Sequence, residues 1–418
     1  MPGALISLLK QVNRSDTASF SIDPAFRWEP VINEAMQNGV AAYLYHRLKQ
    51  TGNLSCVPAA AVDLLRGSYL SATLNHFRVR KTLLDVLRCL SERGIHALVL
   101  KGGYLAEAVY DQGGLRPMGD LDILVRHDQL APATRVLEDL GYRTLDADRA
   151  SSGWETLHHL PQFHKEEQIT IELHWCIERP NLKLDVSFDD LIKNEVQFKV
   201  ADQIAFAPGV VDCLLHLCCH WAQHHLFLTG LRPAVDLAVY LEHFGEDLNW
   251  ELLYETAEQW QVVRLLDLSL QTADELVGCR IPEQIRLRWE KTTGDQEQLK
   301  RLALELVQCD AEALTKYPTN LVAAMEQPAL KELFQLLFNR FFPSPAEMSF
   351  YYPVSARSWR IWFYYPFRWW FLISNYSGRF FTNRLQKITV DPVLQESARI
   401  VELQSQLANA LGIPLGLA

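Results

Sequence analysis

The 418-residue sequence lacks the features that mark several classes of protein. It has no excess of positive charge, because 50 Asp and Glu residues outnumber 40 Lys and Arg residues, which gives a net charge of −10. Proteins that bind long nucleic acids usually present a basic surface, so the charge argues against a nucleic-acid partner. No stretch of 18 uncharged apolar residues occurs either, and we therefore expect no membrane-spanning helix.

Cysteine spacing and the N-terminal residues exclude further classes. The eight cysteines are scattered without a C-x-x-C pair, which fits reduced thiols better than a disulfide framework or a zinc site. The first 16 residues lack the basic start, apolar run and small-residue cleavage site of a signal peptide. We therefore expect a cytoplasmic location.

The pattern of apolar residues divides the chain into four regions. Residues 1–74 read as helical, and residues 75–205 alternate between strand and helix patterns, which predicts a small mixed sheet with helices packed against it. Residues 206–340 read as almost wholly helical, and residues 341–418 form an aromatic and basic C-terminal region. Because 49% of the residues are hydrophobic, a sizeable core is expected. The predicted fold is α+β, with a core at 75–205 flanked by helical regions.

One segment of this core carries most of the functional information. An apolar run, Leu98 to Leu100, leads into the glycine pair Gly102 and Gly103, and a second apolar run carries Asp120 and Asp122. Strand residues two apart project from the same face, so the two carboxylates should lie side by side. A glycine turn lets backbone N–H groups contact phosphate oxygens. Paired carboxylates beside such a turn indicate Mg²⁺-dependent nucleotidyl transfer.

A third acidic residue and two basic residues complete the predicted site. Two Mg²⁺ ions can stabilise the attacking and leaving oxygens of such a reaction, and Mg²⁺ prefers oxygen ligands. Glu172, in the apolar stretch IELHW, is expected either to bind a metal ion or to accept the proton of the acceptor hydroxyl. Lys101 and Arg116 are candidate partners of the triphosphate. The alternative for these two residues is surface charge, or pairing with Asp111 or Asp120.

The motifs of this segment resemble those of the DNA-polymerase-β-like nucleotidyltransferase superfamily, which combines a Gly-Gly or Gly-Ser turn with an Asp-x-Asp strand. The sequence is similar, more narrowly, to a bacterial family of uncharacterised nucleotidyltransferases. The shared residues are Lys101-Gly102-Gly103, Arg116-Pro117, Asp120-Leu121-Asp122 and Gly141-Tyr142. The likeness covers roughly residues 75–250, and Gly103 stands where many relatives have a serine that touches a phosphate.

This resemblance implies an activity, a cofactor and a set of site residues. The activity is transfer of a nucleoside monophosphate from an NTP, with ATP the first candidate, to an unidentified small-molecule, peptide or protein acceptor. Two Mg²⁺ ions are the implied cofactor, with Asp120, Asp122 and Glu172 as the catalytic and metal-binding residues. The implied nucleotide-binding residues are Lys101, Gly102, Gly103, Arg116, His174 and His220. The alternative is a non-catalytic nucleotide-binding or regulatory protein that retains the fold.

Histidines form a second pattern, in the predicted helical region. His216, His220 and His224 recur every four residues and so share one face of a helix. Two such histidines can bind zinc, but no H-E-x-x-H general base accompanies them, and a structural or substrate-facing role is the favoured interpretation. Arg232 and Asp236, also four residues apart, are expected to form an ion pair on their helix, with a place in the substrate wall as the alternative.

The C-terminal region contains a segment of unusual composition. Between Met348 and Val390 there is no acidic residue, and Trp and Tyr alternate with Arg. We expect these aromatic residues to pack internally. Peripheral contact with a membrane through residues 350–381 is the alternative, because aromatic and basic residues together suit the headgroup boundary of a lipid bilayer.

Overall fold

A computed structural model describes most of the first 311 residues and parts of the C-terminal region. The described ranges are 3–14, 26–144, 158–178, 186–290, 295–311, 358–370 and 392–413, together with a few isolated residues. The chain divides into two compact units, of which the first comprises Met1–Leu145 and His158–Val307 and the second Asp146–Leu157 and Gln308–Ala418. All residues of the predicted site lie in the first unit.

A seven-stranded mixed sheet forms the centre of the first unit. Its strands are β1 (Ala97–Val99), β2 (Asp120–Val125), β3 (Arg143–Thr144), β4 (Phe163–His164), β5 (Thr170–His174), β6 (Val196–Val200) and β7 (Gln203–Ala207). Their order is β3-β4-β5-β2-β1-β7-β6. The pairs β1–β7 and β2–β5 are parallel, and the other four are antiparallel. With its flanking helices, this sheet confirms the predicted α+β fold.

The central pair of strands has a register that matters for the site. In the parallel pair β2–β5, Asp122 lies opposite Glu172 and Asp120 lies opposite Thr170. Because strand side chains alternate between faces, Asp120, Asp122 and Glu172 project from the same face of the sheet. The neighbours Leu121 and Ile171 project from the other face and are fully buried.

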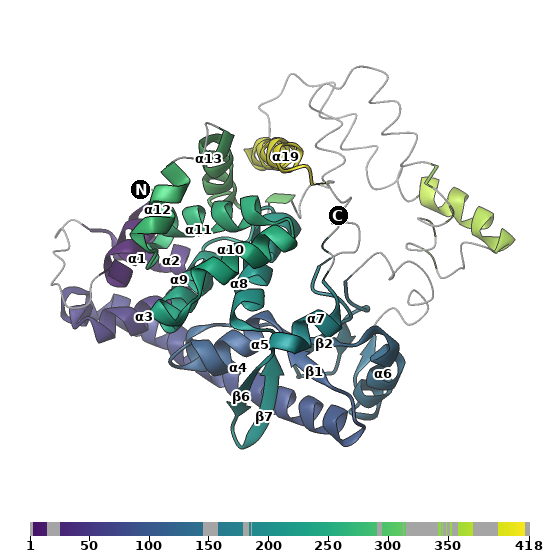
Figure 1. The fold of residues 1–418 in the computed structure, drawn as a ribbon. Helices are drawn as coiled ribbons and strands as arrows, with labels where there is room; N and C mark the ends of the chain where they lie inside the picture. Colours follow the sequence, from purple (N-terminus) through teal and green to yellow (C-terminus); the bar gives the residue numbers. More distant parts are fainter. Residues whose placement is uncertain are drawn as a thin grey trace. The chain divides into compact units, whose positions relative to one another are not determined.

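The described N-terminal part of the chain contributes five longer helices, and the longest of them contacts the sheet. They are α1 (Ala4–Arg14), α2 (Trp28–Gln37), α3 (Ala41–Gln50), α4 (Ala59–Glu92) and α6 (Leu130–Asp139). Helix α4 runs for 34 residues and contacts β1, β2 and α6 (Figure 1). It ends just before Gly94, whose φ of 69° favours glycine.

Between residues 210 and 307 the described chain is mostly helical, as its apolar pattern predicts. The helices are α8 (Val210–Cys219), α9 (Arg232–Phe244), α10 (Trp250–Gln259), α11 (Val263–Val277), α12 (Glu283–Glu290) and α13 (Asp295–Val307). Helix α11 lies at the centre and contacts α1, α8, α9, α10 and α13. The short helical segments of the unit are η1 (Asn53–Cys56), α5 (Lys101–Tyr104), η2 (Leu105–Val109), η3 (Gly113–Leu115), η4 (His127–Gln129), α7 (Phe188–Leu191), η7 (Ile192–Asn194), η8 (His220–His224) and η9 (Gly245–Asp247).

The second unit contains the aromatic C-terminal region. Its described elements are η10 (Trp359–Phe363) and α19 (Pro392–Leu411). Met348, Ile361 and Tyr365 form a small buried cluster. The expected internal packing is wrong for five large side chains of this part, which are exposed: Trp359, Trp362, Phe363, Phe367 and Trp370. Much of the segment 350–381, for which membrane contact is the alternative, lies outside the described residues. Among the described helices, none is long and apolar enough to span a bilayer.

Candidate functional site

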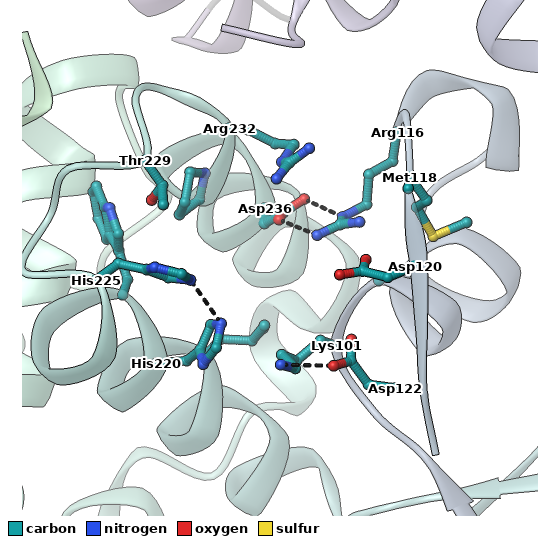
Figure 2. A pocket seen from close by; sticks show the side chains of 15 residues that line it. Lys101, Arg116, Met118, Asp120, Asp122, His220, His225, Thr229, Arg232 and Asp236 are labelled. Carbon is teal, nitrogen blue, oxygen red and sulfur yellow. Dashed lines mark hydrogen bonds and ion pairs between the residues drawn. The ribbon is translucent and has the colours of Figure 1, made fainter. Parts of the chain in front are cut away.

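The first two predicted carboxylates line a cavity of ≈ 380 Å³ between β2 and the helices α8 and α9. Asp120 opens β2 and points into this space, as Figure 2 shows. Within the described part of the chain, its side chain forms neither a hydrogen bond nor an ion pair. Desolvation raises the pKa of Asp120, and the neighbouring carboxylates of Asp122 and Glu172 raise it further.

Asp122 lies deeper in the same wall of the cavity. Its side chain is 7% exposed, and its Oδ1 atom lies 2.8 Å from Lys101 Nζ and 2.9 Å from His174 Nε2. Burial alone would raise the pKa of Asp122, but Lys101 and His174 outweigh that effect and hold it well below its ordinary value. Asp122 therefore stays ionised.

Beneath these carboxylates, His174 connects Asp122 to Glu172. It is fully buried and outside the cavity lining, and its Nε2 atom also lies 3.4 Å from Glu172 Oε2. Glu172 Oε1 accepts a hydrogen bond of 2.6 Å from Gln162. Burial would lower the pKa of His174, but its hydrogen bonds to Asp122 and Glu172 raise it. The structure thus brings the three predicted acidic residues together, with a buried imidazole holding two of them.

The donor set of this cluster fits a divalent cation. Asp122, Glu172 and His174 each offer a ligand atom, and these atoms all lie within 4.8 Å of one another. Asp120 adds a carboxylate at the cavity surface that has no partner among the described residues. Carboxylate oxygens are the ligands that Mg²⁺ prefers, and the pKa of Asp120 is raised by burial and then by the neighbouring carboxylates of Asp122 and Glu172. The residues present therefore suit Mg²⁺.

The Lys-Gly-Gly turn lies at the floor of the cavity, directly after β1. Lys101 has a φ of 41°, a left-handed conformation that is uncommon for a residue other than glycine. Gly102 lines the cavity, and a Cβ there would lie 2.4 Å from Arg116 Nη1. Gly103 is outside the lining, and a Cβ there would lie 2.7 Å from Val99 Cγ1. The absence of a side chain at Gly102 thus leaves space for the guanidinium of Arg116, and its absence at Gly103 leaves space for the side chain of Val99 in β1.

Arg116 is held by a partner distant in the sequence. Its Nε and Nη2 atoms each donate a hydrogen bond of 2.9 Å to the carboxylate of Asp236 (Figure 2). The same carboxylate accepts a hydrogen bond of 2.7 Å from Tyr110. Pairing of Arg116 with Asp111 or Asp120, left open by the sequence, is not what occurs. The expected ion pair between Arg232 and Asp236 is also wrong, because Asp236 faces Arg116 instead.

This arrangement leaves Arg232 as a cation facing the cavity. Within the described ranges, Arg232 forms no ion pair, and burial followed by repulsion from Arg116 lowers its pKa. A guanidinium in this position can bind a phosphate through two parallel hydrogen bonds. The spacing of four residues favoured an ion pair with Asp236, and the structure instead has the arrangement named as the alternative, with both residues in the cavity wall.

Histidines from η8 and from the position directly after it also line the cavity. His220 and His225 line the cavity, and their Nε2 atoms lie 3.0 Å apart (Figure 2). Burial lowers the pKa of His216 to about 3 and that of His220 well below its ordinary value, so both imidazoles are neutral. Of the two histidines predicted to bind nucleotide, His220 reaches the cavity and His174 does not.

Comparison with known proteins identifies a family for this chain. The model of a family described as "Uncharacterised nucleotidyltransferase" matches residues 24–278. This range, more than half of the chain, includes the sheet, the acidic cluster and all residues that line the cavity. No curated protein and no solved structure matches the chain.

Proposed function

Because the chain belongs to the uncharacterised nucleotidyltransferase family, we propose that its cavity transfers a nucleoside monophosphate from an NTP, ATP being the first candidate, to an oxygen of an acceptor. The acceptor oxygen forms a bond to the α-phosphorus, and pyrophosphate leaves. One observation carries this proposal: Asp120 and Asp122 line one side of the cavity, and the guanidinium of Arg232 faces them from the other side. Placement in the DNA-polymerase-β-like superfamily is part of the same proposal.

The acidic residues divide the work of the metal site. Asp120, Asp122 and Glu172 would hold two Mg²⁺ ions, which when bound stabilise the attacking and leaving oxygens. Burial would raise the pKa of Glu172, but its hydrogen bond from His174 lowers it. A carboxylate with a lowered pKa is a weak base, so Glu172 suits metal binding better than proton transfer. Asp120, which faces the cavity, is placed to accept the proton of the acceptor hydroxyl.

The phosphate groups would lie along the opposite wall. Lys101 is already engaged by Asp122, and Arg116 by Asp236. Arg232 is therefore the cation most available to the triphosphate, with the backbone at Gly102 and the imidazole of His220 beside it. Fixed charges on both sides of the nucleotide would hold the α-phosphorus in line with the acceptor, which is how such sites contribute to catalysis.

The size and charge of the protein narrow the class of acceptor. A cavity of ≈ 380 Å³ suits a nucleotide with a small acceptor group inserted beside it. The net charge of −10 disfavours a long nucleic acid. A small molecule, or an exposed side chain of a peptide or protein, remains the proposed acceptor.

The proposal is tested by incubating the full-length protein with each α-labelled NTP, Mg²⁺ and a cell extract, then identifying what becomes labelled. Asp120→Asn and Asp122→Asn should each lower the labelling rate by about 10³-fold, because each removes a metal ligand. Asp139→Asn, at an exposed helix end 2.6 Å from Arg93, is the matched control and should label normally. Labelling that survives in both site variants, or no labelling with any NTP, contradicts the proposal. Metal-independent NTP binding without transfer would indicate a regulator.

A further inference from the structure

A second cluster of potential metal ligands lies apart from the three acidic residues. Glu178 follows β5, and His216 and His220 lie four residues apart where α8 passes into η8. Each residue offers one ligand atom, and the three atoms lie within 4.8 Å of one another. Glu178 and His216 are buried, at 3% and 1% exposed, whereas His220 reaches the cavity.

His216 presents an unprotonated nitrogen to this cluster. The ring makes a hydrogen bond with the backbone of Ile177, and its buried Nε2 atom has no hydrogen-bond partner among the described residues. The bonded nitrogen is therefore Nδ1, which must carry the proton to donate to a carbonyl oxygen. In a neutral ring this leaves a lone pair on Nε2.

His220 is oriented in a corresponding way. Its Nε2 atom lies 3.0 Å from Nε2 of His225. Its buried Nδ1 atom lies 3.8 Å from Glu178 Oε1 and, within the part of the chain that the structure describes, forms no hydrogen bond. Histidines that bind metals characteristically engage their other ring nitrogen in a hydrogen bond, which fixes the tautomer and the orientation of the ring. Both histidines of this cluster meet that condition.

We propose that Glu178, His216 and His220 form a binding site for a divalent transition-metal ion of the zinc class, separate from the Mg²⁺ site. Two imidazoles and one carboxylate suit zinc, whereas Mg²⁺ favours oxygen ligands alone. Three protein ligands leave a fourth position open, as in zinc sites that bind a water or a substrate. Of the three ligands, His220 also lines the cavity, so the site lies beside the space proposed for the nucleotide and acceptor.

The site is tested in the Asp120→Asn/Asp122→Asn background, which removes the ligands proposed for Mg²⁺. The full-length variant is freed of metal with a chelator and titrated with Zn²⁺ by calorimetry and with Co²⁺ by visible absorption. One equivalent of each ion should bind, and bound Co²⁺ should show the intense visible bands of a four-coordinate site. His216→Ala and His220→Ala should each weaken binding by more than about 100-fold. His225→Ala should weaken it about 10- to 100-fold, as expected for a residue that orients a ligand.

Two controls keep this test decisive. His243→Ala removes an exposed imidazole at the end of α9 and should leave Zn²⁺ affinity unchanged. His220 is 18% exposed, so its replacement should preserve folding, checked by circular dichroism, even where that of His216 does not. Absence of Zn²⁺ and Co²⁺ binding in the double-variant background, or binding unaffected by His220→Ala, overturns the proposal. The readout is metal affinity, so the outcome is independent of whether the protein transfers nucleotides.

Discussion

Two neighbouring arginines of the cavity should respond oppositely to the same substitution. Arg116 is paired through two hydrogen bonds with Asp236, whereas Arg232 faces the cavity without an ion pair within the described ranges. We consider replacement of each by methionine, which keeps most of the apolar stem and removes the charge. Arg232→Met should stabilise the protein and weaken NTP binding, and Arg116→Met should destabilise it.

The magnitudes follow from what each guanidinium contacts. Removing Arg232 relieves the cost of a partly buried, uncompensated cation, which should raise the free energy of unfolding by about 1 kcal/mol. The same change removes hydrogen bonds to a charged phosphate worth about 1.5–3 kcal/mol, so the Kd for NTP should rise roughly 10- to 150-fold. Removing Arg116 leaves the Asp236 carboxylate, 5% exposed, without its cation, which costs about 3–5 kcal/mol.

Urea unfolding of both variants measures the stabilities, and calorimetric titration with Mg²⁺ and ATP measures binding. The midpoint of unfolding should move to higher urea for Arg232→Met and to lower urea for Arg116→Met. If Arg232→Met is less stable than the natural protein, or binds ATP equally well, then Arg232 is a structural residue. Either result contradicts the proposed binding of the triphosphate by Arg232.

Two other expectations concern parts of the molecule away from the nucleotide. Burial, with a smaller effect of Asp190, raises the pKa of Asp212 to about 6, above its unfolded value of 3.8. The folded state therefore binds this proton more tightly, and the free energy of unfolding should fall as pH rises from about 4 to 6, by roughly 2–3 kcal/mol in total. Asp212→Asn should remove this slope in urea titrations across that range, and a slope equal to that of the natural protein would contradict the assignment. In the second unit, the exposed Trp359 and Trp362 should favour pelleting with anionic vesicles, and alanine at both positions should reduce it. Equal recovery in the supernatant with and without vesicles would exclude membrane contact by this surface.

Local patterns were sufficient to predict the acidic part of the site. The two-residue period of a strand predicted that Asp120 and Asp122 project together, and they do. The apolar residues around Glu172 predicted a strand, and β5 lies directly beside β2 with Glu172 opposite Asp122. Both inferences depend on the geometry of a single strand, which the sequence encodes within a few residues.

The basic part of the site could not be inferred in the same way. Asp236 is paired with Arg116, 120 residues earlier in the chain, and nothing in the spacing of either residue identifies that partner. The availability of Arg232 depends on this choice. Glu178 was also missed, because one acidic residue after a strand carries no recognisable signal until α8 brings His216 against it. Pairs of residues that are brought together only by tertiary packing have no periodic pattern in the sequence.

The register between β5 and β2 links the stability of the fold to the geometry of the acidic site. Ile171 and Leu173, on either side of Glu172, are 0% and 1% exposed. If β5 slipped by one residue, Glu172 would turn away from Asp122, and both apolar side chains would leave the interior. Any variant that misplaces the third acid in this manner therefore also loses core packing. Selection for a stable fold would by itself keep β5 and β2 in the register that places the three acids together, even over periods without selection for activity.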